Sequence, residues 1–277
     1  MGIVLGLVAA LLYGGSDFGG GLLSRRLGSL PVTIVGSAGA VLLVWPALLL
    51  GHGPAPSVRA IAWGLAAGLG GGTGTLVLYR GLARGQMSVV GPVSAVGAAV
   101  LPVLVGVALG ERPGPLTIVG VLVALPAIAL VAASGTAARG VLRTALVDGL
   151  VAGVAFGILF VGLAQAGPGA GLWPVASEQT STLLVVLAVA VKSRAPFRMG
   201  IRAAGLPFLA GAAGMAATLA YFYATHYSML ATVAVIVSLY PGVTVLLARL
   251  VLHERFSSAQ RAGLGLCTLA IVAIALN

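Results

Sequence analysis

The second half of this 277-residue chain repeats the first at a fixed offset of 143 residues, without a gap. Apolar matches are common by chance in a chain that is 60% hydrophobic, but a repeated Glu-Arg pair is not, because only 7% of the residues are charged. Duplicated membrane halves are typical of secondary transporters, so the repeat constrains function as well as fold. The matches are Gly6–Ala9 with Gly149–Ala152, Gly14 with Gly157, Pro31 with Pro174, Gly68 with Gly211, Thr75 with Thr218, Glu111-Arg112 with Glu254-Arg255, and Gly120 with Gly263.

The composition indicates a chain that lies in lipid. Its mean hydropathy is +1.14, and its charged fraction is far below the roughly 25% of soluble proteins. The first apolar run is followed by Ser24-Arg25-Arg26 rather than by a small-residue cleavage site, so we expect it to be retained as a membrane span. The net charge is +10, but the basic residues are scattered over short loops without an aromatic face, which argues against a nucleic-acid partner.

Ten apolar segments are each long enough to cross the bilayer as a helix, which takes roughly 20 residues. We expect spans at 3–23, 31–50, 59–83, 86–109 and 115–134, and again at 144–165, 171–191, 202–225, 229–252 and 257–276. The predicted fold is an all-α integral membrane protein with ten transmembrane helices. Two five-helix repeats, residues 1–134 and 144–277, would be joined by a cytoplasmic linker at 135–143.

The distribution of basic residues predicts the orientation. With ten spans, 13 of the 15 Lys and Arg residues fall on one side, and only Arg59 and Arg112 fall on the other. The positive-inside rule makes the rich side cytoplasmic. We therefore expect a multi-pass protein of the plasma (inner) membrane with both termini extracytoplasmic. Five spans per half also mean that the second repeat enters the membrane inverted relative to the first.

Glycine and proline indicate where the helices pack and where they are interrupted. Gly149, Gly153 and Gly157 form a seam of small residues that lets a second helix approach closely, and the run Gly70–Gly74 favours tight packing over direct contact with a ligand. Pro92, Pro102 and Pro241 lack a backbone donor and are expected to kink or break their helices. In transporters, such helices expose backbone to substrate near mid-membrane.

Several motifs resemble the drug/metabolite transporter superfamily, specifically its ten-helix branch with two EamA-type repeats. The first span contains Tyr13-Gly14-Gly15-Ser16-Asp17-Phe18, which is similar to the opening pattern of that family. The fourth ends in Leu109-Gly110-Glu111-Arg112, and its second copy reads Leu252-His253-Glu254-Arg255. The resemblance implies a central cavity between the halves, alternating access, and export of metabolites or amino acids. This chain departs from the family pattern at two positions. It has Asp17 where family members often carry Asn, and His253 where they usually carry Gly.

Two acids lie well inside predicted spans and are the strongest functional candidates. Asp17 lies in the first span and Glu178 in the seventh, and their repeat counterparts are Phe160 and Val35. A carboxyl group in hydrocarbon favours its neutral form, which suits proton binding. The alternative is a structural acid bonded to a hydroxyl group or paired with an arginine.

Polar and aromatic residues at helical spacing extend this candidate pathway. Tyr13 lies one turn before Asp17, and Thr75 precedes Tyr79 by the same interval. Such groups suit a ligand with apolar and hydrogen-bonding parts, although each alone is more often a packing residue. The predicted substrate or proton pathway contains Tyr13, Asp17, Thr75, Tyr79, Ser94, Glu178, Thr218, Tyr221, Ser238 and Tyr240.

Other charged residues have plainer interpretations. The pairs Glu111-Arg112 and Glu254-Arg255 suggest gating, but helix-junction structure is the better reading, and Ser257 with Gln260 fits a capping box for the last helix. Asp148 is expected to favour the dipole at the start of the sixth span. Three scattered histidines and a single Cys267 give no metal or catalytic cluster.

The leading hypothesis is a secondary transporter that exports a small metabolite by alternating access. We expect it not to be an enzyme and to use no cofactor. Its expected partners are a small-molecule substrate, protons if flux is coupled, and the lipid bilayer, and it is expected to be a monomer or homodimer. Proton-coupled multidrug efflux is the main alternative, and an intramembrane enzyme or a scaffold is a weaker one. No P-loop is present to support ATP-driven transport.

Overall fold

The structure is a computed structural model, and it describes residues 1–51, 53–84, 86–110, 114–133, 139–167, 169–194, 197, 199–252 and 258–275. Some predicted features lie outside these residues: both Glu-Arg pairs, His52, His253 and Ser257 of the proposed capping box. Residues 135–138 of the linker predicted at 135–143 also lie outside them.

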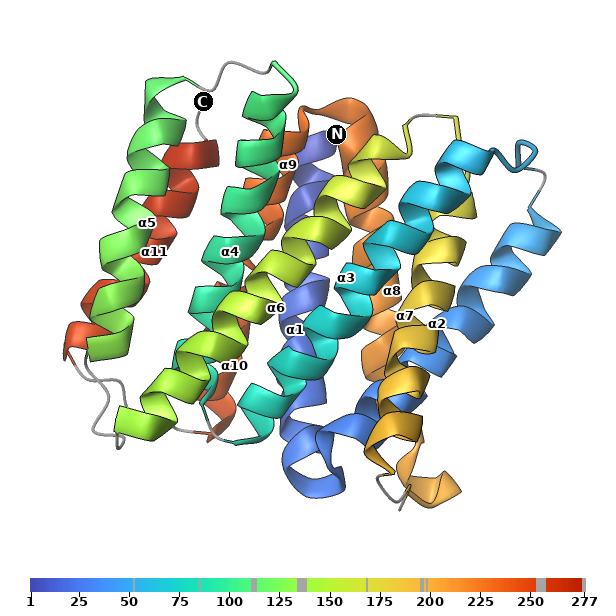
Figure 1. The fold of residues 1–277 in the computed structure, drawn as a ribbon, viewed down its shortest axis with the longest axis horizontal. Coiled ribbons are helices and arrows are strands. Elements are labelled where there is room, and N and C mark those ends of the chain that lie inside the picture. The colour runs from blue at the N-terminus through green and yellow to red at the C-terminus, as the bar shows by residue number, and fades with distance from the viewer. Residues whose placement is uncertain are drawn as a thin grey trace.

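The described chain is helical throughout, with short connections (Figure 1). The first half contains α1 (Gly2–Leu27), α2 (Ser29–Leu50), α3 (Val58–Ala83), α4 (Met87–Ala108) and α5 (Pro115–Ala133). The second half contains α6 (Arg139–Gln165), α7 (Trp173–Ser193), the short 3-10 helix η1 (Ile201–Ala203), α8 (Gly205–Tyr227), α9 (Leu230–Val237), α10 (Tyr240–Leu252) and α11 (Ser258–Ala275). Every predicted span therefore coincides with one helix or with a pair of helices.

Among the described residues, seven helices are long and apolar enough to cross a membrane. They are α1, α2, α3, α4, α6, α7 and α8. The other three predicted spans correspond to α5, to α9 with α10, and to α11, and their membrane crossing stays a prediction.

The prolines have two different effects. The predicted ninth span is interrupted at Ser238 and Leu239, just before Pro241, so the break expected there is confirmed. Pro241 becomes the second residue of α10, where the missing backbone donor costs little. For Pro92 and Pro102 the expectation was a kink or a break, and no break occurs, because α4 continues through both. In membrane helices, neighbouring helices and hydroxyl side chains can compensate for such lost bonds.

Helix pairs in one half correspond to helix pairs in the other. In the first half α3 packs on α6 and α7, and its repeat counterpart α8 packs on α1 and α2. Likewise, α4 packs on α6 while α9 and α10 pack on α1, and α5 packs on α11 (Figure 1). A shift by 143 residues therefore converts each helix pair into its counterpart, for example α3 with α7 into α8 with α2. Most large contacts therefore join one half to the other.

Glycines bring these helices together at backbone distance. Gly153 of α6 faces Gly97 of α4, where an added Cβ would lie 2.9 Å from the Gly97 Cα. The Gly149–Gly157 seam thus packs against α4. Within the run of glycines in α3, Gly70 faces α6 at Ala155 and Gly72 faces α7 at Val185. The tight packing expected for this run is confirmed, since α3 lies between two helices and remains continuous.

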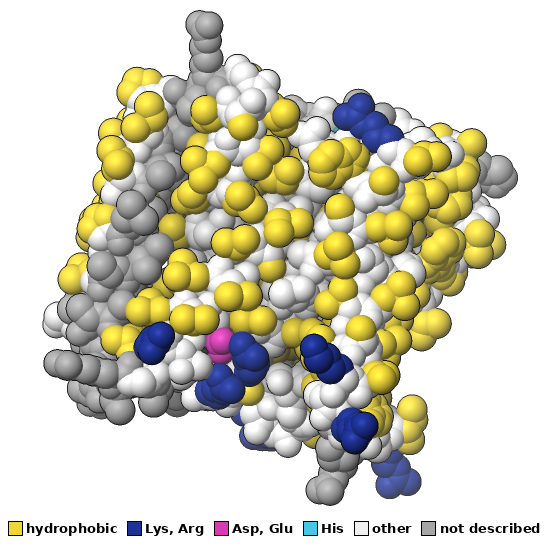
Figure 2. Space-filling view, viewed as in Figure 1, with side chains coloured by type: hydrophobic (Ala, Val, Ile, Leu, Met, Phe, Trp, Pro, Cys, Tyr) yellow, Lys and Arg dark blue, Asp and Glu magenta, His cyan; other side chains and the backbone are white. Residues whose placement is uncertain are grey.

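The outer surface is rich in large apolar side chains, and the interior contains polar side chains besides its apolar core. Large side chains such as Leu50, Val58 and Leu49 are 73–86% exposed, and hydrophobic atoms cover much of the face in Figure 2. Buried groups include Ser94, Asp148, Glu178 and many other polar residues. This distribution fits a chain whose solvent is lipid.

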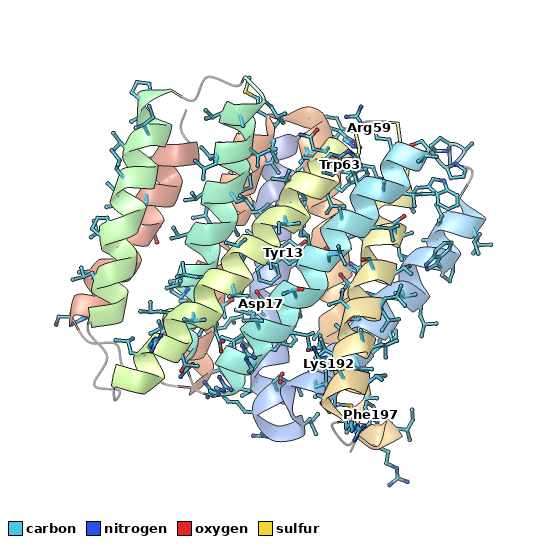
Figure 3. The ribbon with its side chains drawn as sticks, in the orientation of Figure 1. Tyr13, Asp17, Arg59, Trp63, Lys192 and Phe197 are labelled. Atoms are coloured by element: carbon cyan, nitrogen blue, oxygen red, sulfur yellow. The ribbon has the colours of Figure 1, made fainter. Side chains whose placement is uncertain are left out.

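The basic side chains gather at one edge of the bundle. Figure 2 shows most of the visible Lys and Arg at the lower edge, and Lys192 and Arg59 lie at opposite edges in Figure 3. The start of α1 and the end of α11 both lie at the opposite edge from most of these basic side chains (Figure 1).

Candidate functional site

A cavity of about 90 Å³ lies between the two halves of the chain. Helices α1, α2 and α3 line one part of it, and α6, α7, α8 and the first residue of α10 line the rest. This volume is large enough for several water molecules or a small ligand. Seven of the ten predicted pathway residues line it: Tyr13, Asp17, Thr75, Tyr79, Glu178, Thr218 and Tyr240.

Both candidate acids face this cavity. Figure 3 shows Asp17 on α1, near the middle of the bundle, and Glu178 projects from α7. The side chain of Glu178 is 2% exposed, and its Oε1 accepts a hydrogen bond of 3.0 Å from the Thr182 hydroxyl. Its Oε2 is buried and has no hydrogen-bond partner among the described residues. That oxygen is therefore suited to carry a proton or to receive a ligand donor.

No ion pair holds either cavity acid within the described ranges, where Arg80 and Arg84 pair with Asp148 instead. A buried carboxylate without a cation is costly, so its neutral form is favoured. The sequence left open a structural role in which Glu178 is bonded to a hydroxyl group. The structure shows such a bond for only one of its two oxygens, Oε1.

Three tyrosines arrange the wall of the cavity. The Tyr13 hydroxyl and the Thr218 hydroxyl lie 2.8 Å apart and link α1 to α8. Tyr79 donates to the Ser16 carbonyl at 3.3 Å, and the Tyr13 ring packs edge-on against Phe160 at 6.2 Å between centroids. The Tyr240 ring packs in the same way against Phe156. The cavity wall therefore contains both aromatic rings and hydroxyl groups.

The repeat places cavity-lining residues at equivalent positions but with different chemistry. On α1 the wall is formed by Tyr13, Ser16 and Asp17, whereas the equivalent positions of α6 carry Phe156, Leu159 and Phe160. A hydrogen-bonding wall thus faces an apolar one. The duplicated Thr75 and Thr218, in contrast, keep their hydroxyl groups on both sides.

Three predicted pathway residues lie outside the cavity lining. Tyr221 is fully buried and donates its hydroxyl to the Phe160 carbonyl at 2.9 Å. Ser238 donates to the Ala234 carbonyl next to the helix break. Ser94 lies 3.0 Å from the Tyr240 hydroxyl and so supports a lining residue from behind. Helical spacing placed these residues on the right helices but did not resolve which face they occupy.

Other polar lining residues were not predicted from the sequence, most clearly those on α2. Thr33 and Ser37 lie one turn apart on α2 and both line the cavity. Their spacing of four residues places both hydroxyl groups on one face of the helix, and this pattern in the sequence could have identified them. Ser16, Gln179 and Thr182 complete the polar lining, and each is adjacent to an acid or one turn from it.

Asp148 has a different role from the one predicted. It lies nine residues after Arg139, well beyond the first turn of α6, where the helix dipole acts. The carboxylate is buried and accepts hydrogen bonds from Arg80 at 2.6 Å and from Arg84 at 3.3 Å. The dipole interpretation is therefore wrong, because the helix begins earlier than expected. Asp148 instead joins α6 to the end of α3.

Comparison with known proteins identifies the family to which this fold and cavity belong. The model of the EamA-like transporter family matches residues 1–133 and, again, residues 143–276. The chain belongs to the EamA-like transporter family. That family is part of the drug/metabolite transporter superfamily.

Membership makes this EamA-like chain a multi-pass membrane transporter. Such a transporter binds a small-molecule substrate and resides in a lipid bilayer. One solved structure, described only as "Crystal structure of protein", is similar with a TM-score of 0.69 and 16% identity, over 99% of this chain and 96% of that one. At this identity the likeness concerns the fold alone. No curated protein matches the chain.

Proposed function

We propose that this EamA-like protein is a secondary transporter that exports a small metabolite by alternating access, with the central cavity as its substrate site. The observation that carries the proposal is the cavity itself, because both halves line it and it contains both buried acids. Substrate sites of secondary transporters lie at the interface between repeats near the bilayer midplane. A rocking movement of one half against the other would then open the site first to one side of the membrane and then to the other.

The proposed architecture consists of two five-helix repeats, residues 1–134 and 144–277, of inverted topology. Two separate matches to one family model support it, as do the helix pairs that the 143-residue offset exchanges. We assign the basic edge to the cytoplasm of the plasma (inner) membrane, which leaves both termini extracytoplasmic.

The lining of the cavity favours an amphipathic metabolite, such as an amino acid with an apolar side chain. The polar wall formed by Tyr13, Ser16 and Asp17 would bind hydrogen-bonding groups, and the wall of Phe156, Leu159 and Phe160 would bind an apolar part. Multidrug efflux is less well supported, because a cavity of about 90 Å³ suits small ligands better than bulky ones.

Protons, if flux is coupled to them, would bind at Glu178 or Asp17. Both carboxyl groups line the cavity, so a proton and a substrate could compete for the same polar wall. The Oε2 of Glu178, which has no partner within the described part of the chain, is the stronger candidate.

Counterflow in proteoliposomes tests the transport proposal. Vesicles preloaded with one unlabelled amphipathic amino acid should accumulate the labelled compound transiently and with saturation, because a carrier exchanges solute across the membrane without net flux. Vesicles containing denatured protein are the control. A broad screen of small metabolites that yields only unsaturable leak contradicts the proposal.

A further inference from the structure

A second hollow lies on the outer surface of the bundle, away from the central cavity. It is a groove of about 480 Å³ between α3 and α6, lined by Leu69, Gly70, Thr73, Leu150, Val151, Val154, Ala155 and Ile158. All of these residues are apolar except Thr73. Leu69, Val154 and Leu150 are 48–58% exposed, so the groove faces the hydrocarbon of the membrane. It also runs along a contact between the two halves.

A cluster of three arginines, Arg80, Arg84 and Arg143, lies beyond one end of this groove. Arg80 follows Thr73 by seven residues on α3, and Arg143 precedes Leu150 by seven residues on α6, which is about 10 Å along each helix axis. The end of α3 and the start of α6 lie at the same edge (Figure 1), and basic side chains surround a single acid at the lower edge of this face (Figure 2). The arginines therefore lie where lipid headgroups begin.

The charges in this cluster do not cancel. Arg80, Arg84 and Arg143 carry three positive charges against the one negative charge of Asp148. Arg80 and Arg84 each donate one hydrogen bond to Asp148, whereas a guanidinium group has five donors. Their side chains are 49% and 48% exposed. Asp148 thus fixes both arginines beside the groove while leaving a positive surface.

We propose that the groove between α3 and α6 binds an anionic phospholipid, with its phosphate on the arginine cluster and one acyl chain along the apolar lining. An apolar groove alone would accept any lipid, and the excess of positive charge at its headgroup end selects an anionic one. The site joins α3 of the first half to α6 of the second. A lipid bound there bridges the two halves and does not enter the central cavity.

Native mass spectrometry of the protein in detergent tests this site with two probes, phosphatidylglycerol and phosphatidylcholine of the same acyl chains. The wild type should retain phosphatidylglycerol preferentially. Arg143→Gln should weaken that binding about fivefold, the effect of one basic residue near a phosphate. Val154→Trp should weaken it at least as much by filling the groove. Arg143 is preferred to Arg80, whose loss would leave the buried Asp148 less well paired.

Matched controls distinguish this site from general adhesion of lipid. Lys192→Gln removes a basic residue at the same edge on α7, and Leu49→Trp adds bulk to an exposed position of α2. Neither should change phosphatidylglycerol binding. The proposal is overturned if both lipids bind equally, if Arg143→Gln and Lys192→Gln have equal effects, or if Val154→Trp has none.

Discussion

At the scale of single residues, the asymmetry of the cavity is the feature that most bears on function. Asp17 corresponds to Phe160, which also lines the cavity, whereas Glu178 corresponds to Val35, which is not among the lining residues. Since the fold places an apolar residue in the equivalent position, neither acid is needed to build the bundle. A buried acid that architecture does not require is costly to keep, which supports a role in binding substrate or protons.

Substitution of Glu178 by Gln should abolish transport driven by a pH gradient while preserving counterflow. The amide keeps the shape of the side chain and can still contact Thr182, but it cannot gain or lose a proton. Uptake into proteoliposomes, with and without an imposed gradient, measures both activities. Asp17→Asn is the parallel variant. If pH dependence is unchanged in Glu178→Gln, that residue is not the coupling site.

Two tyrosines on the predicted pathway should respond differently to loss of the hydroxyl. Tyr13→Phe should raise the KM for substrate about fivefold, equivalent to one hydrogen bond of about 1 kcal/mol, because Tyr13 lines the cavity. It should also lower stability, because it removes the hydrogen bond between Tyr13 and Thr218. Tyr221→Phe should leave KM unchanged and lower stability by about 1 kcal/mol, since its hydroxyl binds the Phe160 carbonyl instead. Transport kinetics and thermal unfolding in detergent measure the two effects. Equal KM values for the two variants would contradict this assignment.

At the scale of helices, backbone contacts decide which elements pack together. The duplicated glycines Gly68 and Gly211 occupy equivalent crossings, the first of α3 on α7 at Glu178 and the second of α8 on α2 at Gly36. The repeat in the sequence therefore reflects a repeated need for close approach. Glu178 lies at one of these crossings, so the packing that joins α3 to α7 also positions the acid.

Gly211→Ala should destabilise the protein by about 1–3 kcal/mol, the usual cost of overpacking. Its new Cβ would overlap the backbone of Gly36, which cannot move without separating α2 from α8. Gly15→Ala is the matched control, because no atom lies within 4 Å of the position of its Cβ. Thermal unfolding in detergent compares the two variants. Equal stabilities would show that the crossing of α2 and α8 is loose.

At the scale of the whole molecule, the arrangement of the halves and the distribution of charge agree. The start of α1 and the end of α11 share one edge, and the basic cluster lies at the other (Figures 1 and 2). Secondary transporters with inverted repeats move one bundle against the other around a fixed central site. The contacts between halves, α3 with α6 and α1 with α8, would be the surfaces that shift.

Reporter fusions should reveal both termini outside the cytoplasm. A green fluorescent protein fused after Asn277 should stay dark, and an alkaline phosphatase fused there should be active, because the phosphatase needs an oxidising compartment to form its disulfides. A fusion in the connection between α7 and α8, near Arg194, should give the reverse pattern. Fluorescence from the C-terminal fusion would overturn the proposed orientation.

The helical membrane class, the approximate spans, the family and the two acids could all be predicted from the sequence. Each depends on local composition or on a fixed repeat: a span is a run of apolar residues, and Asp17 and Glu178 stand out because charge is rare in hydrocarbon. The helix break before Pro241 could also be predicted from local sequence, because it depends on the proline itself.

Which side chains line the same cavity became clear only from the packing of the helices. It placed Thr33 and Ser37 of α2 in the cavity, removed Tyr221 and Ser238 from its lining, and joined Asp148 to Arg80. The physical reason is that helical spacing fixes the faces of one helix relative to each other. It does not fix the rotation of that helix against its neighbours, which depends on how glycines and side chains from distant parts of the chain pack together.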